Sequence, residues 1–173
     1  EGYLFDAEAA RRAFAKAAGL AHASGRMIAI TLSDGFVVER HREGLLGFLE
    51  TQVDLVFANE TELTALFQTN DFDAAVEAMR SKVKIAAVTR SEKGSVIVAG
   101  AETFAVPAFP VEKVVDTTGA GDQYAAGFMF GLATGRPLNV CGQLGSLAAA
   151  EVISHYGPRP QVSLKDLAAS KGL

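Results

Sequence analysis

Along the chain, short continuous runs of hydrophobic residues alternate with longer runs in which hydrophobic residues have helical spacing. The continuous runs are rich in Val, Ile, Leu and Phe, which is typical of strands that are buried on both faces of a sheet. In residues 7–24, by contrast, Phe14, Ala18 and Ala21 share one helical face before Gly25 ends the helix. This alternation predicts an α/β protein with a mostly parallel sheet flanked by helices.

The predicted strands and helices cover most of the sequence. Residues 1–6, EGYLFD, resemble the end of a strand. Strands are predicted at 27–33, 53–59 and 85–91, and a turn at 92–94 leads to a hairpin partner at 95–100 and a strand at 103–109. Helices are predicted at 7–24, 38–52, 60–67, 72–82, 120–134 and 138–155, with a short helix after Val162. The hairpin adds some antiparallel pairing to the sheet.

Four polar clusters follow the predicted strands. They are Ser33-Asp34, Asn59–Glu62, Thr89–Gly94 and Asp116–Asp122. Ligands of open α/β sheets bind beyond the carboxyl ends of the strands, so these clusters are the candidate binding segments.

Composition narrows the range of partners. The 173 residues carry a formal net charge of −4, which gives no general attraction to nucleic acid or to an anionic membrane, so any phosphate must be bound locally. Cys141 is the single cysteine, which rules out a disulfide within the chain and fits a reducing, cytoplasmic setting. No apolar run approaches the roughly 18 residues of a membrane span.

Small residues and a carboxylate meet at the predicted start of the helix over 120–134. Gly119, Ala120 and Gly121 would let the backbone come close to a ligand, and the first N–H groups of a helix lack internal partners. The alternative is a tight strand-to-helix turn. Asp122 could complement the helix dipole, or it could act as a general base toward a hydroxyl that attacks phosphorus.

Two further clusters have both a structural and a functional interpretation. Asn59 and Glu62 have the spacing of a capping box, which is the simpler interpretation, and their oxygens also suit a hydrated Mg²⁺ beside phosphates. Thr89, Ser91 and Gly94 fit a hairpin loop, and a nucleotide contact is the alternative.

Together these segments resemble the C-terminal half of the ribokinase-like (PfkB) carbohydrate and nucleoside kinases. DTTGAGDQYAAGF (116–128) is similar to the C-terminal signature of that family at essentially every defining position. ANETE (58–62) is similar to its N-x-x-E motif, and VTRSEKG (88–94) to its nucleotide-binding loop. The resemblance covers nearly the whole chain and implies a three-layer fold in which 1–173 is the C-terminal part of a single kinase domain.

The resemblance implies a role for each candidate residue. Asp122 would be the base, and Gly119, Ala120 and Gly121 would form the anion hole for the phosphoryl group of ATP. Asn59 and Glu62 would place Mg²⁺ and its waters. The remaining roles would be nucleotide contacts from Thr89, Ser91, Gly94 and Ser146, and a K⁺ site from Asp116 and Thr118 with carbonyls near Ile153 and Tyr156. Ser91 stands where the family often has Gly, which weakens that one assignment.

The resemblance also implies an N-terminal half, carrying the lid and most acceptor contacts, that these residues do not contain. We therefore expect weak nucleotide binding and poor turnover from residues 1–173 alone. We also expect a small-molecule acceptor, no nucleic acid or membrane partner, and either a homodimer or association with that N-terminal half.

Three segments, 1–6, 31–42 and 144–161, are most similar to bacterial adenosine kinases. The predicted reaction is ATP-dependent phosphoryl transfer to a primary hydroxyl of adenosine or a related ribose-containing acceptor. The alternatives are a PfkB-family sugar kinase acting on ribose, fructose or a keto-deoxy sugar acid, and a nucleotide-binding module without catalysis.

Overall fold

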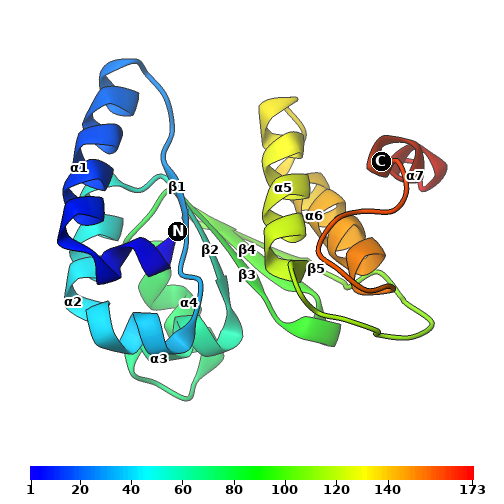
Figure 1. Ribbon diagram of the computed structural model, residues 1–173, viewed down its shortest axis with the longest axis horizontal. Helices are drawn as coiled ribbons and strands as arrows, with labels where there is room; N and C mark the ends of the chain where they lie inside the picture. Colours follow the sequence, from blue (N-terminus) through cyan, green and yellow to red (C-terminus); the bar gives the residue numbers. More distant parts are fainter. The chain divides into compact units, whose positions relative to one another are not determined.

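The computed structural model describes all residues, 1–173, as five strands, seven α-helices and two 3-10 helices, η1 and η2 (Figure 1). The strands form one sheet in the order β1-β2-β3-β4-β5. Their bounds are Ala29–Thr31, Leu55–Asn59, Ile85–Thr89, Ser95–Ala99 and Glu102–Val106. The chain divides into two compact units, the first made of residues 1–88 and 98–103 and the second of residues 89–97 and 104–173.

The sheet is mixed. β1 and β2 are parallel, with Ala29 opposite Leu55. The N–H of Ile85 at the start of β3 donates to the carbonyl of Asp54, just before β2, at 2.9 Å, so these two strands also start at the same edge. The connection 90–94 between β3 and β4 is too short for a parallel crossover, so this pair is antiparallel. The α/β prediction with an added hairpin is confirmed.

The first unit packs five helical segments with β1–β3. They are η1 (Gly2–Asp6), α1 (Glu8–Ala23), α2 (Gly35–Gln52), α3 (Glu60–Phe67) and α4 (Phe72–Arg80). The predicted strand end at residues 1–6 is wrong, because these residues form η1. Phe5 is buried there, with its ring 5.8 Å from the rings of both Phe14 and Phe48. These ring contacts pack η1 against α1 and α2.

Capping side chains account for two helix starts that the apolar pattern alone places loosely. α2 begins at Gly35, three residues before its predicted start, because the Asp34 carboxylate accepts a hydrogen bond from the Phe36 N–H at 2.7 Å. In the short last helix, α7 (Leu164–Ser170), Ser163 is the N-cap and accepts from the Asp166 N–H at 3.3 Å.

The second unit is built on a close pair of helices, α5 (Ala120–Ala133) and α6 (Leu138–Val152) (Figure 1). A Cβ atom at Gly127 would lie 2.5 Å from the Leu144 carbonyl oxygen, and one at Gly145 would lie 2.7 Å from the Tyr124 carbonyl oxygen. The small residues of both helices therefore let the two backbones touch. α6 ends at Val152, three residues before its predicted end at residue 155.

A buried hydrogen bond ties α5 to β4 within this unit. The Tyr124 hydroxyl and the Ser95 hydroxyl lie 2.8 Å apart, and both side chains are buried. Burial raises the pKa of Tyr124 to about 12, so the phenol stays neutral and can keep this bond. None of the helices combines the length and the apolar character that crossing a bilayer requires.

Filling the α5–α6 contact should destabilise the protein. We expect Gly127→Ala and Gly145→Ala each to lower the free energy of unfolding by about 1–3 kcal/mol, because the new methyl group meets backbone that cannot move aside. Gly47→Ala is the matched control. A Cβ at this exposed position of α2 has no atom within 4 Å, so the substitution should stabilise by up to about 1 kcal/mol. Urea denaturation measures all three, and equal effects would contradict the close contact.

Candidate active site

Residues 116–122 form a tight turn that opens directly into α5, and we call it the 116–122 turn. Gly119 is the N-cap of α5 and has a φ of 76°, in the left-handed region. A Cβ at this position would lie 2.6 Å from Cβ of Pro158, so both the backbone angle and the neighbour require glycine. A Cβ at Gly121, by contrast, would have no atom within 4 Å. Gly119 is thus needed by the fold, whereas Gly121 leaves open space at the helix start.

The start of α5 has unpaired backbone donors. The Ala120 N–H donates to the Thr117 carbonyl at 3.2 Å, and the Gln123 N–H donates to the Gly119 carbonyl at 2.9 Å. No acceptor in the structure meets the N–H groups of Gly119, Gly121 and Asp122. With the positive end of the helix dipole, these donors can receive an anion. Of the three predicted anion-hole residues, Ala120 is the one whose N–H is already engaged.

Asp122 is the third residue of α5, and its side chain is exposed. The structure gives its carboxylate no hydrogen bond and no ion pair, and the N-cap of the helix makes no side-chain hydrogen bond. The carboxylate therefore does not cap its own helix, although its charge complements the dipole. It remains open to a ligand, as a general base must be.

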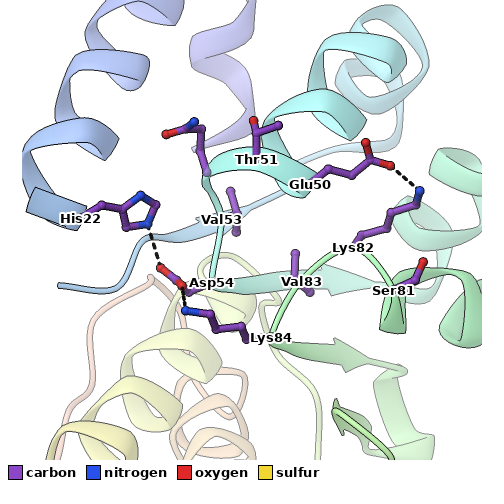
Figure 2. Close-up of a pocket in the computed structure, with 10 residues that line it drawn as sticks. His22, Glu50, Thr51, Val53, Asp54, Ser81, Lys82, Val83 and Lys84 are labelled. Carbon is purple, nitrogen blue, oxygen red and sulfur yellow. Dashed lines mark hydrogen bonds and ion pairs between the residues drawn. The ribbon is translucent and has the colours of Figure 1, made fainter. Parts of the chain in front are cut away.

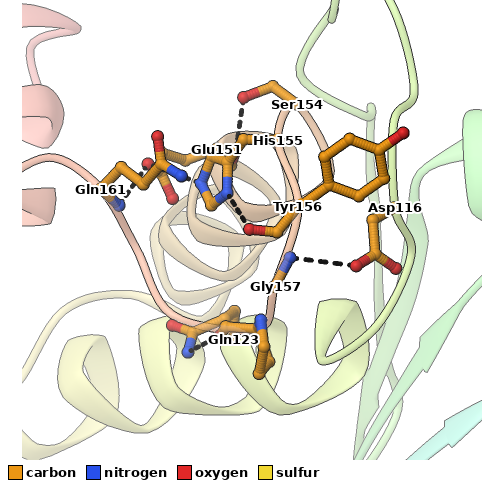
Figure 3. A network of polar contacts seen from close by, with 9 residues as sticks. Asp116, Gln123, Glu151, Ser154, His155, Tyr156, Gly157 and Gln161 are labelled. Carbon is orange, nitrogen blue, oxygen red and sulfur yellow. Dashed lines mark hydrogen bonds and ion pairs between the residues drawn. The ribbon is translucent and has the colours of Figure 1, made fainter.

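Asp116 holds the 116–122 turn against the segment that follows α6 (Figure 3). One carboxylate oxygen accepts from the Thr118 N–H at 2.9 Å, and the other accepts from the Gly157 N–H at 3.0 Å. These bonds, with the Gly157 bond the largest effect, lower the pKa of Asp116 to about 2. Asp116 is therefore ionised in all ordinary conditions.

The segment after α6 lies beside this turn. The Val115 N–H donates to the Ile153 carbonyl at 2.8 Å, and Nδ1 of His155 lies 3.2 Å from the Tyr156 carbonyl. The structure thus gathers the four groups expected for the K⁺ site, from Asp116, Thr118, Ile153 and Tyr156, in one loop cluster. Carboxylate and carbonyl oxygens are the ligand types that a hard cation prefers, although the Ile153 carbonyl already accepts from the N–H groups of Val115 and Asp116.

The predicted nucleotide loop lies in the same unit, at the end of β3. Ser91 begins the short helix η2 (Ser91–Lys93) with a φ of 53°, a left-handed angle that suits the Gly often found there in the family. Gly94 follows with a φ of 85°, and a Cβ there would lie 2.1 Å from the Val106 carbonyl oxygen. Gly94 thus has a structural reason to be glycine. Thr89 is the last residue of β3.

Ser146 is a buried residue of α6. Its hydroxyl donates to the Pro107 carbonyl at 3.2 Å and so ties α6 to the segment after β5. This contact is structural, and a role in lining an adenine pocket stays a prediction.

Asn59 and Glu62 belong to the first unit and form the predicted capping box of α3. The Asn59 side chain accepts from the Glu62 N–H at 2.8 Å, and the Glu62 carboxylate accepts from the Asn59 backbone N–H at 3.0 Å and from its side-chain amide at 2.7 Å. Glu62 is 6% exposed. Burial, helped by the negative charge of Asp34, raises the pKa of Glu62. The hydrogen bond from the Asn59 N–H lowers the pKa but does not outweigh burial.

The carboxylate of Glu62 keeps capacity for a cation such as Mg²⁺, or for the waters around one, in addition to its capping bonds. A carboxylate offers about four lone-pair sites, so Glu62 keeps two of them for further donors. The buried carboxylate has acidic neighbours and no basic partner, an environment that a bound cation would relieve. No group of three or more His, Cys, Asp or Glu side chains is placed to hold a metal ion, so any cation here needs other ligands as well.

A pocket in the first unit lies at the opposite, amino-terminal edge of the strands (Figure 2). Its centre is the buried carboxylate of Asp54, which accepts from the Ile28 N–H at 2.8 Å and pairs with Lys84 at 2.7 Å and His22 at 3.2 Å. Burial raises the pKa of Asp54, but these three contacts outweigh it and bring the pKa below its ordinary value. Lys82 pairs with Glu50. All the charges are therefore matched, and the pocket is a structural cluster.

Sequence reasoning missed the side chains that hold the segment after α6. These are Glu151 and His155, whose side chains lie 3.2 Å apart, and Pro158, which packs on Gly119. An acidic residue four positions before His, inside an otherwise small and apolar helix, was the available signal.

The fold and this site together define an α/β protein in which a helix start with unpaired N–H groups carries a free carboxylate. Its residues 1–164 match the family model described as pfkB family carbohydrate kinase. The chain therefore belongs to the pfkB family, as the sequence motifs predict.

Solved structures agree with this assignment. The adenosine kinase from Sinorhizobium meliloti is 53% identical with a TM-score of 0.96, over 98% of this chain and 52% of that one. A probable sugar kinase protein from Rhizobium etli CFN 42 is 47% identical with a TM-score of 0.97, over 99% of this chain and 52% of that one. The ribokinase-like fold is thus confirmed.

A curated relative is similar over part of the chain. The cytidine kinase of Thermococcus kodakarensis is 36% identical over 119 residues, which are 67% of this chain and 42% of that protein. The chain spans about half the length of the solved relatives, and less than half of this curated one.

The hydrogen bonds of Asp116 predict an unusual acid titration. Its pKa is depressed in the folded protein, so its contribution to stability is present above the ordinary value of 3.8 and is lost as the pH falls toward about 2. The amide signals of Gly157 and Thr118, followed by NMR, should therefore titrate with a midpoint near about 2. Asp116→Asn should abolish this titration. A midpoint near 3.8 would show that the two bonds do not form in solution.

Proposed function

We propose that the protein is an ATP-dependent kinase that transfers a phosphoryl group to a primary hydroxyl of adenosine or a related ribose-containing acceptor. The observation that carries the proposal is the start of α5, where unpaired N–H groups and an unpaired carboxylate, Asp122, stand within one helical turn. A binding-only phosphate site gains nothing from a carboxylate beside the phosphate, because the two charges repel. A kinase needs both groups.

In this proposal the backbone and the carboxylate divide the work. The N–H groups of Gly119, Gly121 and Asp122 would receive the phosphoryl oxygens, where negative charge increases in the transition state. The Asp122 carboxylate would orient the acceptor hydroxyl and take its proton as the oxygen attacks phosphorus. Fixed donors require no reorganisation during the reaction, so they favour the transition state over the bound substrates.

The proposed cofactors are ATP, Mg²⁺ and K⁺. Bound Mg²⁺ would neutralise phosphate charge, and Asn59 and Glu62 would hold its waters. Asp116 and Thr118, with the Ile153 and Tyr156 carbonyls, would hold K⁺ next to the anion site. Thr89, Ser91, Gly94 and Ser146 would contact the nucleotide.

The identity of the acceptor is inferred from the relatives. The adenosine kinase at 53% identity and the cytidine kinase at 36% identity favour a nucleoside. The sugar kinase at 47% identity keeps the alternative of ribose, fructose or a keto-deoxy sugar acid.

A direct assay separates these possibilities. The full-length protein is incubated with ATP, Mg²⁺ and one acceptor at a time, and ADP release is measured. We expect kcat/KM for adenosine to exceed that for each sugar by at least about 100-fold, because a site built to bond the base leaves polar groups unpaired with a sugar. Faster turnover of a sugar would favour the alternative. ADP binding without transfer to any acceptor would favour the binding module.

The role of Asp122 has its own test. Asp122→Asn removes the proton acceptor and keeps the shape, so kcat should fall by about 10²- to 10⁴-fold while the Kd for ADP stays within about twofold. Asp166→Asn is the matched control, because Asp166 is also an exposed aspartate at the third position of its helix. It loses the same dipole interaction but should keep full activity. An Asp122→Asn protein with full kcat would show that Asp122 is not the base.

A further inference from the structure

One buried carboxylate closes the segment that follows α6. Glu151 lies in the last turn of α6, and its side chain is 7% exposed. Its Oε1 atom lies 3.2 Å from Nε2 of His155 and accepts from the Gln161 N–H at 2.9 Å (Figure 3). A single oxygen therefore holds both ends of the segment 155–161.

The closed segment contacts the 116–122 turn at two places and the next residue of α5 at a third. The Gly157 N–H donates to the Asp116 carboxylate at 3.0 Å, and the side-chain amide of Gln123 donates to the Pro158 carbonyl at 3.2 Å (Figure 3). Pro158 also packs on Gly119, where a Cβ would come within 2.6 Å of the ring. The position of the left-handed turn at Gly119 thus depends on a segment that Glu151 closes.

The second carboxylate oxygen of Glu151 shows that stability alone does not explain this residue. Oε2 is buried and has no hydrogen-bond partner. A buried, unpaired polar atom costs free energy, and an apolar side chain of similar size would avoid this cost. The benefit of Glu151 must therefore lie in what Oε1 holds in place.

We propose that Glu151 is a positioning residue for the 116–122 turn: by joining His155 to Gln161 it fixes the segment that orients Asp116 and Gly119. The effect on phosphoryl transfer rests on the proposed kinase function. Because the free N–H groups of the turn act on charge that develops in the transition state, loss of Glu151 should lower kcat more than it raises KM.

Two variants of Glu151 in the full-length protein test the proposal. Glu151→Leu fills the space without an acceptor, and kcat should fall by at least about tenfold while KM for ATP changes by less than about twofold. Glu151→Gln keeps one acceptor oxygen and should rescue a large part of kcat. Ser154→Ala is the control, because it removes an exposed hydrogen bond next to this segment, 2.6 Å to the Glu151 carbonyl, without opening the closure. It should keep kcat unchanged.

A measurement without turnover separates this proposal from the kinase proposal. In Glu151→Leu the amide hydrogens of Gly157 and Thr118 should exchange at least about tenfold faster, while those in the middle of α5 keep their rates. If this occurs in a protein that transfers no phosphoryl group, the kinase proposal is overturned and the positioning role stands. Unchanged exchange at both amides, or a Glu151→Leu protein with full kcat, overturns the positioning role. If Glu151→Leu does not fold, the same exchange comparison in Glu151→Gln decides, with a smaller increase expected.

Discussion

The carboxylate of Asp116 joins two parts of the chain that are 41 residues apart, and the candidate site depends on that junction. Its two oxygens accept hydrogen bonds from the N–H groups of Thr118 and Gly157. These bonds hold the turn that precedes α5 against the segment that follows α6. Because both bonds are to the ionised form, the pKa falls to about 2 and the junction persists at any physiological pH. The unpaired N–H groups at the start of α5 therefore belong to a backbone segment that this junction holds in place.

Glycine has two different roles in the second unit, residues 89–97 and 104–173. Gly127 and Gly145 let α5 and α6 approach until backbone meets backbone, and Gly119 takes a left-handed angle under Pro158. These three positions serve the fold. Gly121 has open space where a side chain would be, so its value lies in what can approach the helix start. Glycine thus supports close packing at Gly119, Gly127 and Gly145, and access for a ligand at Gly121.

Three carboxylates singled out by the sequence motifs, Glu62 in the first unit and Asp116 and Asp122 in the second, lie in three environments, and their chemistry differs accordingly. Asp116 is stabilised as an anion by backbone donors. Glu62 is buried near another acidic residue, which raises its pKa and favours a cation nearby. Asp122 is exposed and has no partner. The proposed phosphoryl transfer would use such differences, because it needs one carboxylate that accepts a proton and others that hold cations.

Local sequence pattern is sufficient for the α/β class, for the order of elements after residue 6 and for the family. Apolar runs of the right period mark the strands and helices, and the DTTGAGD motif marks the turn that carries the site, because both are patterns among neighbouring residues. The capping box at Asn59 and Glu62 was predictable for the same reason, since its contacts lie three residues apart. Residues 1–6 were misjudged because Phe5 is placed by distant aromatic rings rather than by its own neighbours in the chain. Three features became visible in the folded chain alone: Asp122 does not cap its helix, the Ala120 N–H is already bonded, and Glu151 closes the segment over Gly119. The closure over Gly119 depends on groups that meet across long stretches of sequence, and local pattern carries no record of them. The other two features lie within one turn, but they depend on its backbone angles, which residue types alone do not specify.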